Sequence, residues 1–203
     1  MIYLSFDIEE FDMPKEYGFD IPFERQMSIS REGLTAILDL LQKHEAKATF
    51  FSTVVFAQNA SDLIQRLLSE GHELASHTYY HSDFAIEHLR SSKEALESQF
   101  GVSIEGLRMP RMLEVSATDV SQAGYSYNSS VNPTFLPGRY NKLQVPRALF
   151  REGDLWQIPA AVSPWRIPLF WLSFHNFPLW YYKYLLVRTI RSLGYAALYF
   201  HPW

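Results

Sequence analysis

Two histidines four residues apart, His77 and His81, stand in the stretch ASHTYYHSDF at the end of a short apolar run. Neutral imidazole is a common metal ligand, and in the first turn of a helix an i,i+4 pair lies on one face. With a carboxylate from elsewhere in the chain, the pair forms a three-ligand site that leaves positions open for water, as catalytic zinc sites do. Taken alone, the spacing favours the alternative of two surface or capping histidines.

The beginning of the chain supplies the carboxylates that such a site needs. SFDIEEFD places four acidic residues within six positions, and Asp7 and Glu9 point to the same side of a strand because side chains alternate. Two carboxylates on one face repel each other, so a cation is expected between them. A solvated acidic loop is the alternative for this segment alone. The histidine pair at a neighbouring strand end favours a metal site.

Three further residues have side chains suited to catalysis. LRMPR contains Arg108 and Arg111, and an arginine beside paired carboxylates can hold one of them by a bidentate hydrogen bond and keep it ionised. LYFHPW contains His201, which can donate or accept a proton near neutral pH. Ordinary surface arginines and a structural core histidine are the alternatives, and neither motif decides the function by itself.

The chain alternates between predicted strands and predicted helices. Strands are expected at residues 2–8, 47–56, 72–77, 104–110, 125–130 and 195–201. Helices are expected at residues 30–44 with Ser30 as N-cap, 60–71, 84–101, 116–124 and 177–194. This order implies a parallel sheet with helices outside it, whose strand ends converge on one mouth. The acids, histidines and arginines all follow predicted strands, so they are expected at that mouth.

Composition narrows the class of protein. With 203 residues, 47% hydrophobic and 20% charged, the chain is expected to form one globular domain. The net charge of −4 gives no indication of nucleic-acid binding. There is no cysteine, so any metal must be held by His, Asp or Glu. The N-terminus does not read as a signal peptide, and a cytoplasmic location is expected.

One segment, residues 167–187, is very apolar. A membrane-spanning helix needs about 20 continuous apolar residues, and this segment is interrupted by His175, Asn176, two prolines and Lys183. A buried segment is the favoured interpretation. An aromatic surface that faces lipid or sugar is the alternative.

In this order, the segments resemble the polysaccharide deacetylase family (carbohydrate esterase family 4, the NodB-homology domain). SHTYYH matches its H-[ST]-x-x-H motif, SFDIEE its acidic first motif, RMPR its third, GDLW loosely its fourth and LYFH its closing L-x-x-H. The resemblance runs from Ser5 to His201. It implies an α/β fold, an irregular (β/α) barrel that is usually seven-stranded, as one domain over residues 1–203. Related chains generally continue past the last motif, which leaves open that this one is cut short.

The resemblance also implies an activity, the metal-dependent removal of N-acetyl groups from an amino sugar in a polysaccharide or its precursor. The usual first motif has adjacent aspartates, whereas Ile8 separates Asp7 from Glu9 here, as in a D-x-[DE] subgroup. Under this assignment Asp7 is the base, Arg108 orients it and His201 is the acid. The ligands of one divalent ion, Zn with Co or Ni as alternatives, are Glu9, His77 and His81. Glu10 or Asp12 is the alternative carboxylate ligand in place of Glu9.

The remaining expected roles concern the substrate. Arg111 replaces the usual aromatic residue after the proline, so an oxyanion contact there is expected from its backbone N–H. Trp156, in the weak fourth motif with Asp154, is expected to pack against His201 or a sugar ring. Leu198 is expected to line a pocket for the acetyl methyl group.

Two other functions stay open, namely hydrolysis of another amide or ester and carbohydrate binding by a non-catalytic barrel. The lack of a secretion signal favours a lipid- or nucleotide-linked carbohydrate over a mature wall polymer. The aromatic segment at residues 167–187 then suggests peripheral contact with a membrane. Neither the sugar nor the oligomeric state is indicated by the sequence.

Overall fold

The computed structural model describes the backbone of residues 1–203 and every side chain except that of Glu16. The strands are β1 (Ile2–Ile8), β2 (Ala48–Ser52), β3 (Glu73–Ser76), β4 (Gly106–Leu107), β5 (Tyr127–Asn128), β6 (Phe135–Leu136), β7 (Tyr140–Asn141), β8 (Phe150–Glu152), β9 (Leu155–Gln157) and β10 (Ala196–Phe200). The helices are α1 (Met13–Glu16), α2 (Phe23–Lys43), α3 (Val54–Asn59), α4 (Ser61–Ser69), α5 (His88–Phe100), α6 (Ala117–Gln122), α7 (Trp171–Asn176), α8 (Leu179–Leu193) and the 3-10 turn η1 (Pro110–Met112).

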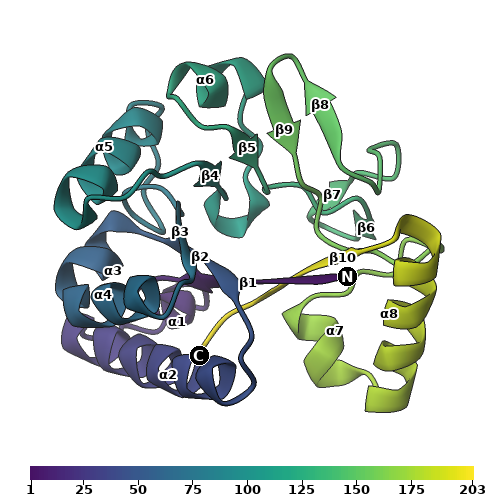
Figure 1. Ribbon diagram of the computed structural model, residues 1–203, viewed down its shortest axis with the longest axis horizontal. Helices are drawn as coiled ribbons and strands as arrows, with labels where there is room; N and C mark the ends of the chain where they lie inside the picture. Colours follow the sequence, from purple (N-terminus) through teal and green to yellow (C-terminus); the bar gives the residue numbers. More distant parts are fainter.

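The main sheet has eight strands in the order β10-β1-β2-β3-β4-β5-β9-β8. Every neighbouring pair is parallel except β8 with β9, so seven strands run in one direction. Figure 1 shows the sheet curling round on itself with helices outside it. A backbone hydrogen bond of 2.8 Å from Ala161 N to Ala197 O joins the segment after β9 to β10. The predicted barrel-like α/β fold is confirmed, with β8 added as an antiparallel strand at its edge.

The core lies between the first strands and the helices that cover them. Leu34, Leu38 and Leu41 of α2 are buried at the spacing that makes one helical face. Phe50 of β2 is fully buried in the same cluster and stacks on Phe6 of β1 at 5.4 Å. Burying each such side chain stabilises the fold by about 1.5–3 kcal/mol. The predicted periodicity of this helix is therefore confirmed by the residues it buries.

Two predicted boundaries near this core are wrong. Helix α2 begins at Phe23, and Ser30, expected as its N-cap, is buried in mid-helix. The buried stripe continues back through Gln26, whose polarity hid it from the hydrophobic pattern. The strand expected at residues 47–56 stops at Ser52. There the Oγ1 of Thr53 accepts a hydrogen bond of 3.1 Å from Phe56 N and starts α3.

Helix α2 also holds the end of the chain in place. A Cβ atom at Gly33, in the middle of this helix, would lie 1.9 Å from Pro202 O. Glycine inside a helix costs about 1 kcal/mol relative to alanine, and here its lack of a side chain lets the C-terminal segment reach the helix. Gly33 thereby fixes the course of the chain immediately after His201.

The apolar segment at residues 167–187 forms α7 and most of α8, joined through Pro178. In the part of the chain that the structure describes, no helix has the length and hydropathy that crossing a bilayer requires. The expectation of a buried segment holds for Leu169, Phe170 and Leu185, whereas Trp180 is 72% exposed. The expectation of a buried segment is therefore wrong for most of these residues, because more of them are exposed than buried.

Candidate metal centre

The carboxyl ends of four parallel strands, β10, β1, β3 and β4, meet at one place on the barrel. Glu9 follows β1, the loop with His77 and His81 follows β3, Arg108 follows β4 and His201 follows β10. β10 pairs with β1 and β3 with β4, with β2 between the two pairs, and all five strands are parallel. Their ends therefore share one mouth, as the order of elements predicts. Residues that are far apart in the sequence thus come together.

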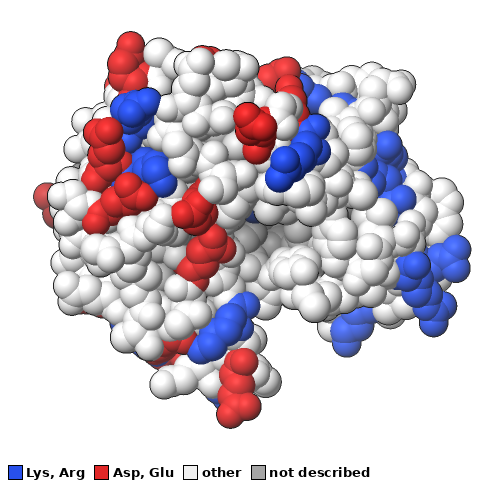
Figure 2. All heavy atoms as spheres, turned by 45° about the horizontal axis from the view of Figure 1, so that its top comes forward, with Lys and Arg blue, Asp and Glu red and all other residues white. Residues whose placement is uncertain are grey.

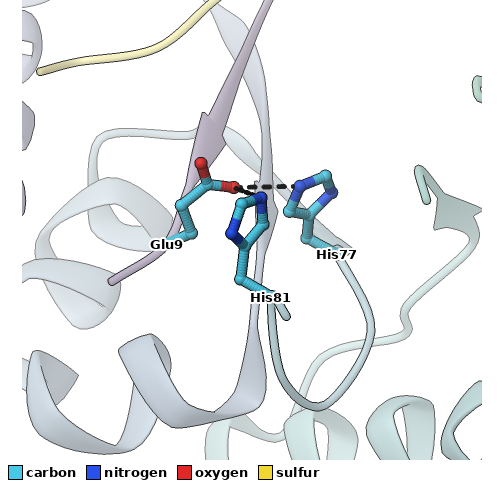
Figure 3. Close-up of side chains that lie close together, drawn as sticks. All are labelled: Glu9, His77 and His81. Carbon is cyan, nitrogen blue, oxygen red and sulfur yellow. Dashed lines mark ion pairs between the residues drawn. The ribbon is translucent and has the colours of Figure 1, made fainter. Parts of the chain in front are cut away.

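Glu9 lies opposite both histidines. Its Oε2 is 3.0 Å from His77 Nε2 and 3.4 Å from His81 Nε2, and one ligand atom from each residue lies within 4.8 Å of the others. Figure 3 shows the two imidazoles directed at the same carboxylate oxygen. Their rings are 5.9 Å apart and inclined by 22°. Three buried side chains that could bind one cation therefore converge.

The far side of each ring is held by an oxygen. His77 Nδ1 lies 2.8 Å from Arg108 O, and His81 Nδ1 lies 2.6 Å from Asp12 Oδ1. A carbonyl or carboxylate oxygen accepts, so in each ring Nδ1 donates the hydrogen bond. In the neutral form, Nε2 is then left with a lone pair facing Glu9. This is the arrangement in which proteins orient histidines that bind metal.

The carboxylate of Glu9 supplies a test of whether a cation fits. Its Oε2 is buried and receives no hydrogen bond of suitable geometry from the side chains and backbone that the structure describes. Burial acts to raise the pKa of Glu9, but the charge of His81 and the contact with His77 outweigh it and lower that pKa to about 2. A buried, ionised and unsatisfied oxygen is costly without a cation. Two imidazoles and one carboxylate match the ligands of catalytic zinc sites.

His81 carries the compensating charge when no metal is bound. Burial acts to lower the pKa of His81, while Glu9 and Asp12 raise it to about 9. The metal-free site is therefore held together by a protonated imidazole between two carboxylates. Because a metal ligand must be a neutral imidazole, a bound cation takes the place of that proton.

The loop after β3 brings the two histidines together without a helix. Both histidines precede α5, so they do not share a helical face, the arrangement considered for i,i+4 spacing. Instead Thr78 has φ +66°, a conformation that costs a β-branched residue about 1–3 kcal/mol. The loop is held by hydrogen bonds from His77 N to Ser52 O (2.7 Å) and from Val54 N to Thr78 O (3.1 Å).

The two substitutes considered for Glu9 have other partners. Glu10 Oε2 accepts a hydrogen bond of 2.7 Å from Thr53 Oγ1, and its other oxygen lies near His81 N. Asp12 binds the Nδ1 side of His81 and accepts a hydrogen bond from Ser82 Oγ. Glu9 is therefore the carboxylate that faces both Nε2 atoms, and Asp12 supports one of the rings from behind.

Asp7 and Arg108 form a buried ion pair beside the three ligands. Arg108 Nη1 lies 2.7 Å from Asp7 Oδ1, and both side chains are about 4% exposed. The other guanidinium nitrogens bond Ser129, and the group lies 4.0 Å from the ring centroid of Phe51. Asp7 thus receives one hydrogen bond from Arg108, not the bidentate pair expected. Its Oδ2 points elsewhere, 3.8 Å from His201 Nε2.

His201, which directly follows β10, lies beside Asp7 and Glu9. Its Nε2 lies 3.9 Å from Glu9 Oε1, and burial lowers the pKa of this imidazole. The rings of Trp171 and Trp203 pack on it at centroid distances of 5.4 and 4.6 Å. Trp203 lies two residues after His201, beyond the end of β10. Nothing in the sequence indicates Trp171, because α7 was not predicted.

Arg111 lies at the rim of the mouth. Its backbone is left-handed, with φ +55°, inside η1. Its Nη2 donates a hydrogen bond of 3.1 Å to Ser82 Oγ and lies 4.0 Å from Asp12 Oδ2. The side chain therefore borders the loop that carries His81.

Two expected substrate residues lie away from the centre. Trp156 sits in β9, half-exposed, under the guanidinium of Arg151 at 4.4 Å, so the expected packing against His201 is wrong. Asp154 lies in the exposed turn between β8 and β9. Leu198 packs with Leu185 in the cluster beneath α8. It faces outward because side chains alternate along β10 and His201 faces inward.

The model of the polysaccharide deacetylase family matches residues 1–127, which is more than half of the chain. The chain belongs to the polysaccharide deacetylase family. The matched part of this family member runs from β1 to β5, so it includes the three candidate ligands and the Asp7–Arg108 pair.

A curated relative of this deacetylase-family chain is the chitooligosaccharide deacetylase of Rhizobium leguminosarum bv. phaseoli. It is 34% identical over 109 residues, which cover 48% of this chain and 48% of that protein. The chain spans less than half of the curated relatives it matches, down to 22% for a chitooligosaccharide deacetylase of Bradyrhizobium.

Solved structures resemble almost the whole chain. A Mycobacterium smegmatis protein assigned to the polysaccharide deacetylases matches with a TM-score of 0.69 and 18% identity, covering 99% of this chain and 76% of that one. An allantoinase matches with a TM-score of 0.68 and 15% identity, covering 99% and 77%. At such identities the likeness shows the fold alone.

Proposed function

We propose that this chain is a metal-dependent hydrolase that removes N-acetyl groups from an amino sugar in a polysaccharide or its precursor. The observation that carries the proposal is the convergence of Glu9, His77 and His81 with each Nδ1 already bonded. Membership of the polysaccharide deacetylase family and the likeness to a chitooligosaccharide deacetylase support this choice of substrate class. We further assign the chain to the D-x-[DE] subgroup, with Glu9 as the carboxylate ligand.

The chemistry begins with the cation that these residues would hold. A divalent ion, Zn²⁺ or else Co²⁺ or Ni²⁺, supplies a Lewis acid that makes water a better nucleophile and polarises a carbonyl. Glu9, His77 and His81 would hold it, because Glu9 Oε2 and the two Nε2 atoms face one another. Arg108 O and Asp12 keep the two rings in the orientation that this binding requires.

Asp7 is the proposed base. Its Oδ1 is occupied by Arg108, which leaves Oδ2 to accept the proton of the attacking water. Arg108 is itself immobilised by Ser129 and Phe51, so it is a positioning residue for Asp7. The base is thus held rigidly at the edge of the ligand group.

His201 is the proposed acid. An amide nitrogen leaves poorly without a proton, and His201 Nε2 lies on the side of the ligand group where Asp7 Oδ2 and Glu9 Oε1 are both within 4 Å. Trp171 and Trp203 fix the ring. These two indoles are proposed to face the sugar in place of Trp156, and the backbone N–H of Arg111 to face the developing oxyanion.

The substrate is proposed to be a lipid- or nucleotide-linked carbohydrate, handled in the cytoplasm or at a membrane. A panel of such compounds, alongside N-acetylated oligosaccharides and other amides and esters, tests this assignment by release of acetate. Acetate from O-acetyl esters alone would move the chain to another hydrolase class.

The deciding experiment combines metal analysis of protein purified without a histidine tag with acetate release from N-acetylated oligosaccharides. One divalent ion per chain and loss of acetate release in His77→Ala are expected. His44→Ala, an exposed histidine at the end of α2, is the matched control and retains activity. Acetate release that persists in His77→Ala would refute the proposal. A bound metal with no turnover of any panel member would indicate a carbohydrate-binding barrel.

A further inference from the structure

Helix α8 presents an exposed face that combines aromatic and basic side chains. Residues three and four apart share a helix face, and the buried side of α8 is formed by Tyr182, Leu185 and Thr189. The opposite, exposed face, here called the α8 face, consists of Trp180, Lys183, Tyr184, Val187, Arg188 and Arg191. Trp180 is 72% exposed, Tyr184 48% and Val187 45%. Large apolar side chains therefore stand in solvent between three positive charges.

A tryptophan from outside the helix extends this face. The ring of Trp165 stacks on Tyr184 at 6.3 Å with an angle of 17°, and the guanidinium of Arg188 lies 5.7 Å from the Trp165 centroid. Trp165 is itself 54% exposed. The aromatic rings are thus held in a fixed order beside the charges, as parts of one continuous surface.

The charge of this part of the chain is one-sided. Residues 155–203 contain four basic residues and no acidic one, whereas residues 1–129 contain 20 acidic and 10 basic residues. Figure 2 shows basic and no acidic side chains on the side of the molecule that α8 forms. The overall charge of −4 therefore conceals a positive face.

We propose that the α8 face docks on the surface of an anionic lipid bilayer. Interfacial helices have lysine and arginine with tryptophan and other large apolar residues, and they lie in the plane of the membrane. Trp and Tyr favour the headgroup level, and each Lys or Arg gains attraction to anionic lipid. Helix α8 is too short and polar to span a bilayer, so it docks from one side. The inference goes beyond the proposed function and does not depend on it.

The test is flotation of the full chain with vesicles made of equal parts phosphatidylcholine and phosphatidylglycerol, or of phosphatidylcholine alone. Binding to the anionic vesicles is expected, with little binding to the neutral ones and loss of binding at high salt. The triple variant Lys183→Gln/Arg188→Gln/Arg191→Gln is expected to bind on the order of 100-fold more weakly, at about fivefold per charge. Trp180→Ala is expected to weaken binding with no change in charge.

The matched control removes three basic residues from the opposite part of the molecule. Lys15→Gln/Arg25→Gln/Lys43→Gln changes the net charge equally, and these exposed side chains belong to α1 and α2. This variant is expected to bind like the wild type, and Phe19→Ala is the corresponding control for Trp180→Ala. Thermal unfolding confirms that each variant is folded.

Several outcomes overturn the inference. Equal binding to both kinds of vesicle, equal binding by the two triple variants, or no binding at low salt each refutes it. A dimer that the α8-face variants dissociate would instead show that a second copy covers this face. Because no substrate or metal is used, these results do not depend on whether the chain is a deacetylase.

Discussion

His81 Nδ1 lies 2.6 Å from Asp12 Oδ1, on the side of the ring opposite to Glu9. The imidazole is therefore fixed between two carboxylates, of which one faces its Nε2 and the other holds its Nδ1. The first is placed as a metal ligand and the second as the group that orients the ring. The distinction between these two acids can be tested directly.

Asp12→Asn is expected to weaken metal binding by about 10- to 100-fold while leaving the fold intact, because outer carboxylates orient and strengthen the histidine ligand. The measurement is competition with a chromophoric chelator, using protein without a histidine tag. Asp20→Asn, an exposed acid nearby in the sequence, is the control. An unchanged affinity in Asp12→Asn would show that Asp12 does not support the site.

The pH dependence of the metal-free protein should reveal His81. Its folded-state pKa of about 9 exceeds the ordinary value of 6.5, so the folded state holds a proton that the unfolded state releases. The stability that this contributes is fully present below about pH 6.5 and is lost as the pH rises through 9. Urea unfolding of chelator-treated protein is therefore expected to require less urea at pH 9 than at pH 6.5.

The same proton gives a second readout. Because the bound metal replaces it, metal uptake between pH 6.5 and 8 should release about one proton from His81. Calorimetry in buffers of different ionisation enthalpy measures this number. Asp12→Asn should lower both the number of protons released and the slope of the unfolding free energy against pH. An unchanged slope would assign the pH dependence to a group other than His81.

The pair Asp7–Arg108 is expected to show the behaviour of a buried ion pair. Arg108→Met leaves a buried carboxylate without its partner and should lower the free energy of unfolding by about 3–5 kcal/mol. The double variant Asp7→Leu/Arg108→Met should regain most of that loss, because neither charge remains, yet it should release no acetate. Denaturant unfolding and acetate assays on both variants check this. Equal losses in the single and double variants would contradict it.

Thr53 links the start of α3 to the acidic loop after β1. Its Oγ1 accepts from Phe56 N and donates to Glu10 Oε2 at 2.7 Å. Thr53→Ala should therefore cost about 1–2 kcal/mol for the helix cap, with a further loss for the unpaired carboxylate. Ser116→Ala is the matched control, since Ser116 precedes α6 but makes no capping hydrogen bond. Similar costs in the two variants would argue against the cap.

The sequence could predict features that depend on repeated local patterns. Leu34 and Leu38 recur at helical spacing because the same side of α2 contacts the core throughout. Likewise Asp7, Glu9 and the two histidines could be assigned to one mouth, because parallel strand ends converge there. Regular helix and sheet geometry repeats at fixed intervals along the chain, so the sequence alone indicates which residues share a face or a strand end.

Features that depend on a single backbone angle or a distant contact could not be predicted. The left-handed turn at Thr78 returns His81 to the side of His77, although i,i+4 spacing favours a helix. Trp171 reaches His201 only through the packing of α7, which has no strong periodicity. Leu198 was wrongly assigned to the acetyl pocket because of its position in the closing motif. The alternation of side chains along β10 already places it on the outer face of the sheet.

The parallel pairing of β1 with β10 has a consequence for assembly. Residues 2–6 pair with residues 196–200, and β1 lies between that last strand and β2. Pairing between segments so far apart in the sequence is slow to form, because the loop to be closed is long. A ribosome will have delivered Glu9 and both imidazoles well before the strand that carries His201. Until then, the backbone groups at one edge of β1 have no β10 to pair with and can pair with another chain. Of the proposed site residues, His201 is the last to be synthesised.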